Sequence, residues 1–269
     1  QAVGIYDEVT VSAADSLKIS GLGAFADQIP TDETNLAWKA AQLVARACGE
    51  DPNIHIQIDK SIPIAAGMAG GSADAAATLV ACDTYWNAGI PRDQLDAMAA
   101  TLGSDVPFML HGGCALGVGR GDVLSPVMIR GSFHWVFATF DEGLSTAQIY
   151  EKTDEMRGLE FEAEPEVPTE LLSALARGDA PLLGRLLHND LQKAAITSRP
   201  LLGRVLEQGI DYGALGAIVS GSGPTCAFLV RDESSAIDLV VALKASGLVD
   251  DVLRTHGPVH GARVISTSR

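Results

Sequence analysis

Hydrophobic and polar residues alternate in the first part of the chain, as they do in a strand with one buried face. Residues 5–20 alternate loosely and predict two strands with a turn at Ala13–Asp15. Residues 53–60 place isoleucines between polar side chains and predict a third, half-buried strand. Because the first residues already have strand character and no initiator Met precedes them, we expect that an N-terminal segment is missing.

Apolar residues change to helical spacing on either side of this third strand. The first helix can be capped by Thr34 or Asn35 and is ended by Gly49. After Pro63 comes the loop AAGMAGGS, followed by an alanine-rich stretch that is unbroken to Gly89. The pattern therefore predicts a helix that begins directly in a glycine-rich loop.

Helices and strands continue to alternate to the end of the chain, and a second unit begins near Phe133. The further predicted helices cover residues 92–102, 168–176, 180–194, 199–208 and 234–246. Residues 114–129 predict strand and turn, and further strands are predicted at residues 133–140, 217–219, 226–230 and 262–265. The acidic stretch 160–170 indicates an exposed loop. This order predicts an α+β fold with two domains, residues 1–130 and 131–269.

Composition favours a soluble protein with a sizeable core. The chain has 269 residues, of which 47% are hydrophobic. No apolar stretch approaches the ~18–20 residues that span a bilayer, and the start lacks a secretory signal pattern, so we expect a cytoplasmic protein without membrane contact. The four cysteines are scattered without CxxC spacing, which favours free thiols over disulfides or a metal site.

A formal net charge of −15 argues against nucleic acid as a partner, because its backbone is bound by clustered Lys and Arg. An anionic substrate would have to be attracted locally instead. Helix N-termini, backbone N–H groups and a metal ion are the candidates for this attraction.

The glycine-rich loop between the third strand and its helix is the strongest chemical signal. Gly67, Gly70 and Gly71 permit positive φ angles and let a phosphate approach the main chain. Ser72 and the first helical N–H groups would donate to the anion, and the helix dipole adds about half a positive charge there. A flexible loop without a ligand is the alternative. The loop matches neither a Walker A motif nor GxGxxG.

Asp105, in the motif GSDVPF, has two possible roles. It can cap the helix that Val-Pro begins, which is a purely structural role. It can also act as a catalytic carboxylate that orients or deprotonates a hydroxyl attacking the γ-phosphate of ATP.

The motif SGSGPT, residues 220–225, lies between two apolar strands. Glycines on both sides of Ser222 suit either a plain turn or a second anion cradle. Together with the first loop it predicts a two-sided clamp on phosphates, with Ser222 and Gly223 as binding residues. Thr146 and Tyr150 are further candidates to line a pocket, the alternatives being a capping threonine and a core tyrosine.

Three ordered motifs, PIAAGMAGGSADAAA, GSDVPF and SGSGPT, resemble the GHMP kinase superfamily. GSDVPF with GVGRGD is similar to the branch of 4-diphosphocytidyl-2-C-methyl-D-erythritol kinases. The resemblance implies a ribosomal-S5-like N-terminal domain and a ferredoxin-like C-terminal domain, with the active site in the cleft. It also implies ATP-dependent phosphorylation of the 2-hydroxyl of that cytidine diphosphate-linked methylerythritol, in the non-mevalonate isoprenoid pathway, with Mg²⁺ accompanying ATP.

The resemblance further implies roles for individual residues. Asp105 corresponds to the catalytic aspartate, and no metal ligand is assigned. Thr146, Tyr150, Ser222 and Gly223 correspond to substrate-binding positions, where an aromatic ring can stack on cytosine. Asn35 and Lys60 correspond to adenine contacts. The remaining nucleotide-binding positions are Pro63, Gly67, Met68, Ala69, Gly70, Gly71, Ser72 and Ala73.

One part of the family pattern is absent. Family members open with a strand resembling Pro-x-Lys-x-Asn-Leu and a Gly-Tyr-His segment, which supply a catalytic lysine, an asparagine and cytosine contacts, and this sequence contains neither. Two alternatives therefore remain beside the leading function. One is another GHMP kinase, of the homoserine or mevalonate type, and the other is a non-catalytic ATP-binding remnant. A monomer or a homodimer is expected in each case.

Overall fold

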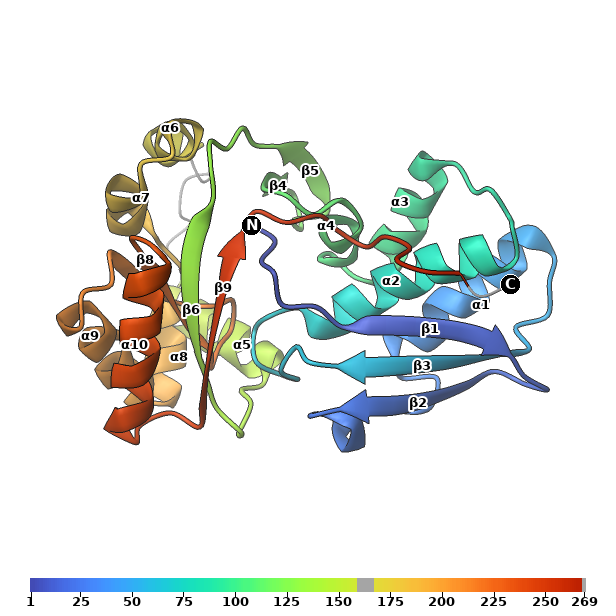
Figure 1. Ribbon diagram of the computed structural model, residues 1–269, viewed down its shortest axis with the longest axis horizontal. Coiled ribbons are helices and arrows are strands. Elements are labelled where there is room, and N and C mark those ends of the chain that lie inside the picture. The colour runs from blue at the N-terminus through green and yellow to red at the C-terminus, as the bar shows by residue number, and fades with distance from the viewer. Residues whose placement is uncertain (159–166, 268–269) are drawn as a thin grey trace. The chain divides into compact units, whose positions relative to one another are not determined.

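The computed structural model describes residues 1–158 and 167–267, which form two compact units (Figure 1). Unit 1 comprises Gln1–Ile64, Ala69–Pro126 and the residues from Val259 on, and unit 2 comprises Ala65–Met68 and Val127–Pro258. The domain boundary predicted at residue 130 concerns family domains and stays a prediction. Most of the acidic loop predicted at 160–170 lies outside the described residues.

Unit 1 is built on a three-stranded sheet of order β1-β3-β2. β1 (Glu8–Ala13) pairs antiparallel with β3 (Ile54–Lys60), and β2 (Lys18–Gly23) pairs parallel with β3. The two early strands were predicted, but β3 lies between them and they do not pair with each other. β3 is the central strand because its three isoleucines are buried on one face.

Four α-helices accompany this sheet among the described residues of unit 1. They are α1 (Leu36–Cys48), α2 (Gly70–Tyr85), α3 (Arg92–Leu102) and α4 (Val106–His111). A 3-10 helix, η1 (Ala26–Gln28), precedes them, and a hairpin of β4 (Ala115–Val118) and β5 (Val123–Pro126) follows. α2 packs against α1 and β1 (Figure 1), and alanines in the core let the two helices approach closely.

The ends of α1 follow the prediction and the end of α2 does not. The Asn35 side chain accepts a hydrogen bond from the N–H of Ala37 at 2.9 Å, and Gly49 ends α1 in the left-handed conformation. α2 ends at Tyr85, before the predicted Gly89. Asn87 has a φ of 50°, which no α-helix accommodates, so the helix stops before it.

Unit 2 contains a fully antiparallel sheet of order β7-β8-β6-β9. Its strands are β6 (Phe133–Thr139), β7 (Gly216–Val219), β8 (Cys226–Val230) and β9 (Asp251–Gly257). The prediction of a last strand at 262–265 is wrong, because β9 takes that place beside β6 and residues 262–265 are irregular. β9 is an edge strand with many exposed polar side chains, so its hydrophobic signal is weak.

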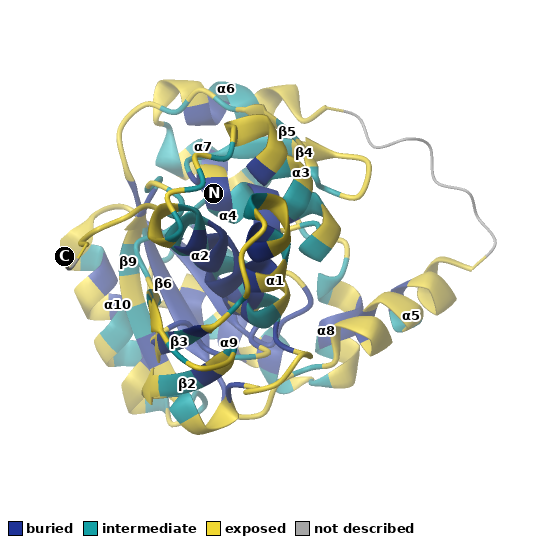
Figure 2. Cartoon of the chain, turned by 90° about the vertical axis from the view of Figure 1, so that its right-hand side faces the viewer, coloured by how far each residue is buried: buried dark blue, intermediate teal, exposed yellow. Residues whose placement is uncertain are grey.

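Six helices complete the described part of unit 2. They are α5 (Thr146–Arg157), α6 (Thr169–Arg177), α7 (Ala180–Leu186), α8 (Gln192–Ser198), α9 (Leu201–Asp211) and α10 (Glu233–Ser246). α5 was not predicted, since only Ile149 and Thr153 in it are buried, and Figure 2 shows it largely exposed. Within residues 1–158 and 167–267, no helix has the length and apolar character needed to cross a membrane.

The helix predicted at 180–194 is in fact two helices, α7 and α8. Asn189 lies in the break and hydrogen-bonds in three directions. Its amide donates to the carbonyls of Val219 and Gly221, both at 2.8 Å, and its side-chain oxygen accepts from the N–H of Leu191 at 3.0 Å. These bonds replace the helical ones, because an asparagine competes for backbone groups.

Candidate nucleotide and substrate site

The loop that joins β3 to α2 contains three residues with positive φ. Ala65, Gly67 and Ala69 have φ angles of 52°, 73° and 53°. Of the three glycines that permit positive φ here, Gly67 adopts it, whereas Gly70 and Gly71 are the first residues of α2. Alanines rarely adopt this conformation because the Cβ clashes with the backbone, and such residues concentrate at functional sites.

Gly70 and Gly71 differ in what surrounds them. A Cβ on Gly70 would lie 3.0 Å from both the Lys60 ammonium and the Ile62 side chain, so a side chain there would force both neighbours to shift slightly. A Cβ on Gly71 would meet nothing within 4 Å. No side chain caps this end of α2, so the N–H groups at its start receive no hydrogen bond from a capping side chain. That arrangement suits an anion.

Lys60 and Asn35, the two residues assigned to adenine, are both buried and engaged within unit 1. The Lys60 ammonium lies 2.5 Å from Asp7 and 2.7 Å from Asp74. The Asn35 amide donates to the carbonyl of Pro30 at 2.7 Å, in addition to the capping bond of its oxygen. These contacts give both side chains a role in the fold, and contact with adenine stays a prediction.

Asp105 stands at the start of α4, where the capping alternative would place it. Its backbone is already helical, with φ −83° and ψ −18°, and its side chain makes no capping hydrogen bond. The capping interpretation is therefore wrong. The residue is exposed, and α4 packs against α2, the helix that the glycine-rich loop opens. An exposed carboxylate without a capping partner is available to a substrate hydroxyl.

The second motif, residues 220–225, touches the first loop within unit 2. The Ser220 hydroxyl donates to the carbonyl of Gly67 at 2.9 Å. A Cβ on Gly67 would come 2.1 Å from the Ser220 carbonyl oxygen, so the two backbones meet at a distance that only glycine allows. The two loops are therefore in direct contact, and a clamp on phosphates stays a prediction.

Thr146 and Tyr150 lie one turn apart on α5. The Thr146 hydroxyl is 2.9 Å from the hydroxyl of Ser222, which is itself buried. Ser145, not Thr146, caps the helix, and Tyr150 is 54% exposed rather than part of the core. Both structural alternatives are therefore wrong, and the two side chains are available to a ligand.

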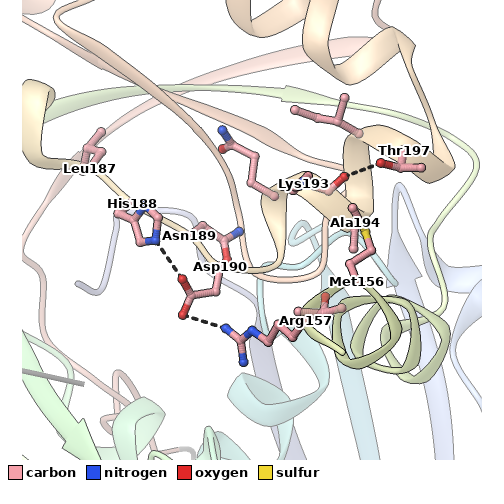
Figure 3. A pocket seen from close by; sticks show the side chains of 12 residues that line it. Met156, Arg157, Leu187, His188, Asn189, Asp190, Lys193, Ala194 and Thr197 are labelled. Carbon is pink, nitrogen blue, oxygen red and sulfur yellow. Dashed lines mark hydrogen bonds and ion pairs between the residues drawn. The ribbon is translucent and has the colours of Figure 1, made fainter. Parts of the chain in front are cut away.

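A pocket that the sequence did not predict lies between the C-terminal half of α5 and α8 (Figure 3). Its volume is about 650 Å³, and Thr153, Met156 and Lys193 are among its lining residues. Asp190 in its wall lies 2.7 Å from His188 and 3.2 Å from Arg157. No motif or periodicity marks these residues, because they come together only through the packing of two helices and the turn at Asn189.

In the described ranges, no group of three or more His, Cys, Asp or Glu residues is placed to hold a metal ion.

Comparison with known proteins identifies the family. The profile of the GHMP kinases N terminal domain matches residues 35–113, and that of the GHMP kinases C terminal domain matches residues 171–248. A 4-diphosphocytidyl-2-C-methyl-D-erythritol kinase from Mycolicibacterium gilvum is 52% identical over 267 residues, covering 98% of this chain and 83% of the relative. The kinase of the same name from Mycobacterium tuberculosis is 52% identical over 265 residues, with the same coverage.

Solved structures agree with this assignment. The crystal structure of a 4-(cytidine 5'-diphospho)-2C-methyl-D-erythritol kinase has a TM-score of 0.75 at 29% identity, covering 94% of this chain and 87% of that one. A homoserine kinase from Cytophaga hutchinsonii has a TM-score of 0.76 at 18% identity, covering 97% and 88%, and shows the shared fold alone. The resemblance in the motifs is confirmed, and the chain belongs to the GHMP kinase family, in the branch of the 4-diphosphocytidyl-2-C-methyl-D-erythritol kinases.

Proposed function

We propose that this chain transfers the γ-phosphate of ATP, bound with Mg²⁺, to the 2-hydroxyl of 4-diphosphocytidyl-2-C-methyl-D-erythritol. The observation that carries the proposal is the 52% identity over 98% of the chain to kinases of that name. The fold alone does not separate this substrate from others, since a homoserine kinase has nearly the same TM-score. As finer parts of the same proposal, the enzyme works in the cytoplasm as a monomer or a homodimer.

The start of α2 is proposed to bind the ATP phosphates. Its uncapped N–H groups and its dipole favour negative charge, which an acidic chain of net charge −15 cannot attract through its overall field. The open space at Gly71 lets a phosphate oxygen reach the backbone. The contact between Ser220 and Gly67 supports the path of the loop that leads there.

Asp105 is proposed as the catalytic base. Its carboxylate accepts the proton of the acceptor 2-hydroxyl while that oxygen forms a bond to the γ-phosphorus. The bond between the γ-phosphorus and the β,γ-bridging oxygen breaks, and ADP leaves. An exposed carboxylate without a capping hydrogen bond supports this role, because its lone pairs are not engaged in the helix.

The acceptor is proposed to bind through Thr146, Tyr150, Ser222 and Gly223. The exposed ring of Tyr150 can stack on cytosine, and an offset stack of this kind contributes about 0.5–1.5 kcal/mol. The paired hydroxyls of Thr146 and Ser222 offer both a donor and an acceptor to the ligand. Cytidine nucleotides should then compete with the acceptor, as they would not for a homoserine or mevalonate kinase.

The test is ATP consumption with 4-diphosphocytidyl-2-C-methyl-D-erythritol and Mg²⁺, measured on this chain and on a version extended upstream. Homoserine and mevalonate serve as alternative acceptors under the same conditions. Turnover with the cytidine compound alone supports the proposal, and turnover in the extended version alone places an essential group upstream. Turnover with one of the other acceptors instead would reassign the substrate. ATP binding without turnover in either version would favour the non-catalytic alternative.

A further inference from the structure

Three buried charged side chains meet beneath the start of α2. Asp7 precedes β1, Lys60 is the last residue of β3, and Asp74 lies in the second turn of α2. The Lys60 ammonium is 2.5 Å from Asp7 and 2.7 Å from Asp74. The side chains of Asp7 and Lys60 are 2% exposed and that of Asp74 is 6% exposed. No motif considered above includes Asp7 or gives Asp74 a role.

Asp7 holds the point at which the chain leaves β3 and enters the glycine-rich loop. One of its carboxylate oxygens accepts hydrogen bonds from the N–H groups of Ser61 and Ile62, at 2.7 and 2.8 Å. Its other oxygen accepts from Lys60. Both oxygens are therefore engaged, and the first two residues of the loop are fixed relative to the sheet.

Lys60 brings a positive charge to the helix end. A Cβ on Gly70, the first residue of α2, would lie 3.0 Å from the Lys60 ammonium. A helix N-terminus already carries about half a positive charge, so a cation at this place is unfavourable unless carboxylates compensate for it. Asp7 and Asp74 provide this compensation.

Asp74 is incompletely satisfied. One of its oxygens bonds to Lys60, and the other is buried without a hydrogen-bond partner among the described residues. Burial raises the pKa of this carboxyl to about 7, and Lys60 opposes the rise. The charged groups that act on it from the described segments are Lys60 on β3 and Asp7 before β1.

The protonation of Asp74 sets the charge of the cluster. With both carboxylates ionised, two negative charges surround one positive charge and the cluster carries −1. With Asp74 protonated the cluster is neutral. A buried charge acts strongly on its neighbours because little water screens it, so this difference should be felt by an anion at the start of α2.

We propose that Asp7 and Asp74, acting through Lys60, are positioning residues for the nucleotide phosphates: they fix the loop entry and the start of α2, and determine how much positive charge reaches the anion. This inference rests on the proposed ATP binding at the start of α2. It does not depend on which acceptor receives the phosphate.

The test is Asp74→Asn, which keeps the size of the side chain and an oxygen for Lys60 while removing the titratable negative charge. The Kd for ATP with Mg²⁺ is measured at pH 6, 7 and 8 on the wild type and the variant. Because the nucleotide titrates identically in both, the ratio of the two Kd values isolates the cluster. We expect the variant to bind about threefold to tenfold more tightly at pH 8, with no difference at pH 6.

Asp93→Asn is the matched control, since it removes one exposed aspartate charge from α3 in the same unit. It should leave the pH dependence of the ATP Kd as in the wild type. A second readout is the proton taken up on ATP binding at pH 7, from calorimetry in two buffers of different ionisation enthalpy. The wild type and the control should take up a fraction of a proton more than Asp74→Asn, because a bound anion favours protonated Asp74.

Outcomes for the cluster and for the proposed function are separable. If the wild type and Asp74→Asn bind ATP with the same pH response and the same proton uptake, the inference is overturned while ATP binding stands. If the wild type does not bind ATP, the inference fails together with the nucleotide part of the proposed function. Should Asp74→Asn not fold, Asp74→Glu retains the titrating group and is expected to keep the proton uptake, whose loss would count against the cluster.

Discussion

The hydroxyl of Ser220 donates a hydrogen bond of 2.9 Å to the carbonyl of Gly67, across 153 positions of the sequence. The bond joins the glycine-rich loop after β3 to the motif at residues 220–225, within unit 2. The motif at residues 220–225 was weak evidence for a phosphate site alone, because a plain turn would explain its glycines. Their contact is consistent with a single binding site, and it makes the geometry of the glycine-rich loop depend on the motif at residues 220–225.

Gly67→Ala should therefore distort the loop. The new Cβ would lie 2.1 Å from the Ser220 carbonyl oxygen, and φ at this residue is 73°. We expect a loss of about 1–3 kcal/mol in the free energy of unfolding and a weaker affinity for ATP. Urea denaturation and ATP titration measure the two effects. Gly49→Ala is a suitable control, because Gly49 has a similar φ of 75°, has no atom near its would-be Cβ and lies outside the proposed site. Normal ATP binding by both variants would contradict a role of the contact between Gly67 and Ser220 in nucleotide binding.

Gly71→Val should weaken ATP binding, whereas Gly70→Val should destabilise the fold. The side chain at Gly71 enters open space, so the fold should remain while the valine occupies the place proposed for a phosphate, and the ATP Kd should rise at least about tenfold. The side chain at Gly70 is directed at Lys60 and Ile62, so overpacking should lower the unfolding free energy by about 1–3 kcal/mol. Thermal melts with and without ATP distinguish the two. An unchanged Kd in a folded Gly71→Val variant would place the phosphates elsewhere.

Asp105→Asn should lower turnover by roughly 10²–10⁴-fold and leave ATP affinity largely intact, as expected for a lost acid–base group. Its unfolding free energy should also stay unchanged, because the side chain makes no capping hydrogen bond in α4. Single-turnover kinetics, ATP titration and denaturation are the measurements. Asp179→Asn is a contrasting control: that carboxylate does cap a helix, accepting from the N–H of Leu182 at 2.9 Å, and lies outside the proposed site. Wild-type turnover in Asp105→Asn would reject the base assignment.

Local signals predicted much of the fold. The cap at Asn35, the stop at Gly49 and the alternating isoleucines of β3 each determine their structure through neighbours in sequence, and all three were predicted. Features that depend on distant partners were not. β9 is a strand because β6 lies beside it, and helix α5 has only two buried residues to indicate its face.

In the candidate site, too, features set by local sequence were predicted and features set by distant partners were not. The residue types of the three motifs indicated phosphate chemistry, and the family comparison agrees. The φ angles did not follow from residue type, because Ala65 and Ala69 adopt the left-handed conformation while Gly70 and Gly71, which permit it, are helical. The cluster of Asp7, Lys60 and Asp74 could not be predicted, since its members come from three separate segments and are joined only by packing.

The side chain of Asn189 should hold the motif at residues 220–225 in place. Its amide donates to the carbonyls of Val219 and Gly221, on either side of Ser220, while its oxygen holds the turn between α7 and α8. Asn189→Ala leaves the partly buried carbonyl of Val219 and the exposed carbonyl of Gly221 without this donor, and each lost hydrogen bond contributes about 0.5–1.5 kcal/mol. We expect an unfolding free energy lower by about 1–3 kcal/mol and a KM for ATP raised several-fold, because Ser220 would no longer be held against Gly67. The neighbouring change His188→Ala removes a side chain that is 79% exposed and should alter neither quantity. A variant of Asn189 that is destabilised but keeps the wild-type KM for ATP would show that the turn supports the fold without positioning the phosphate loop.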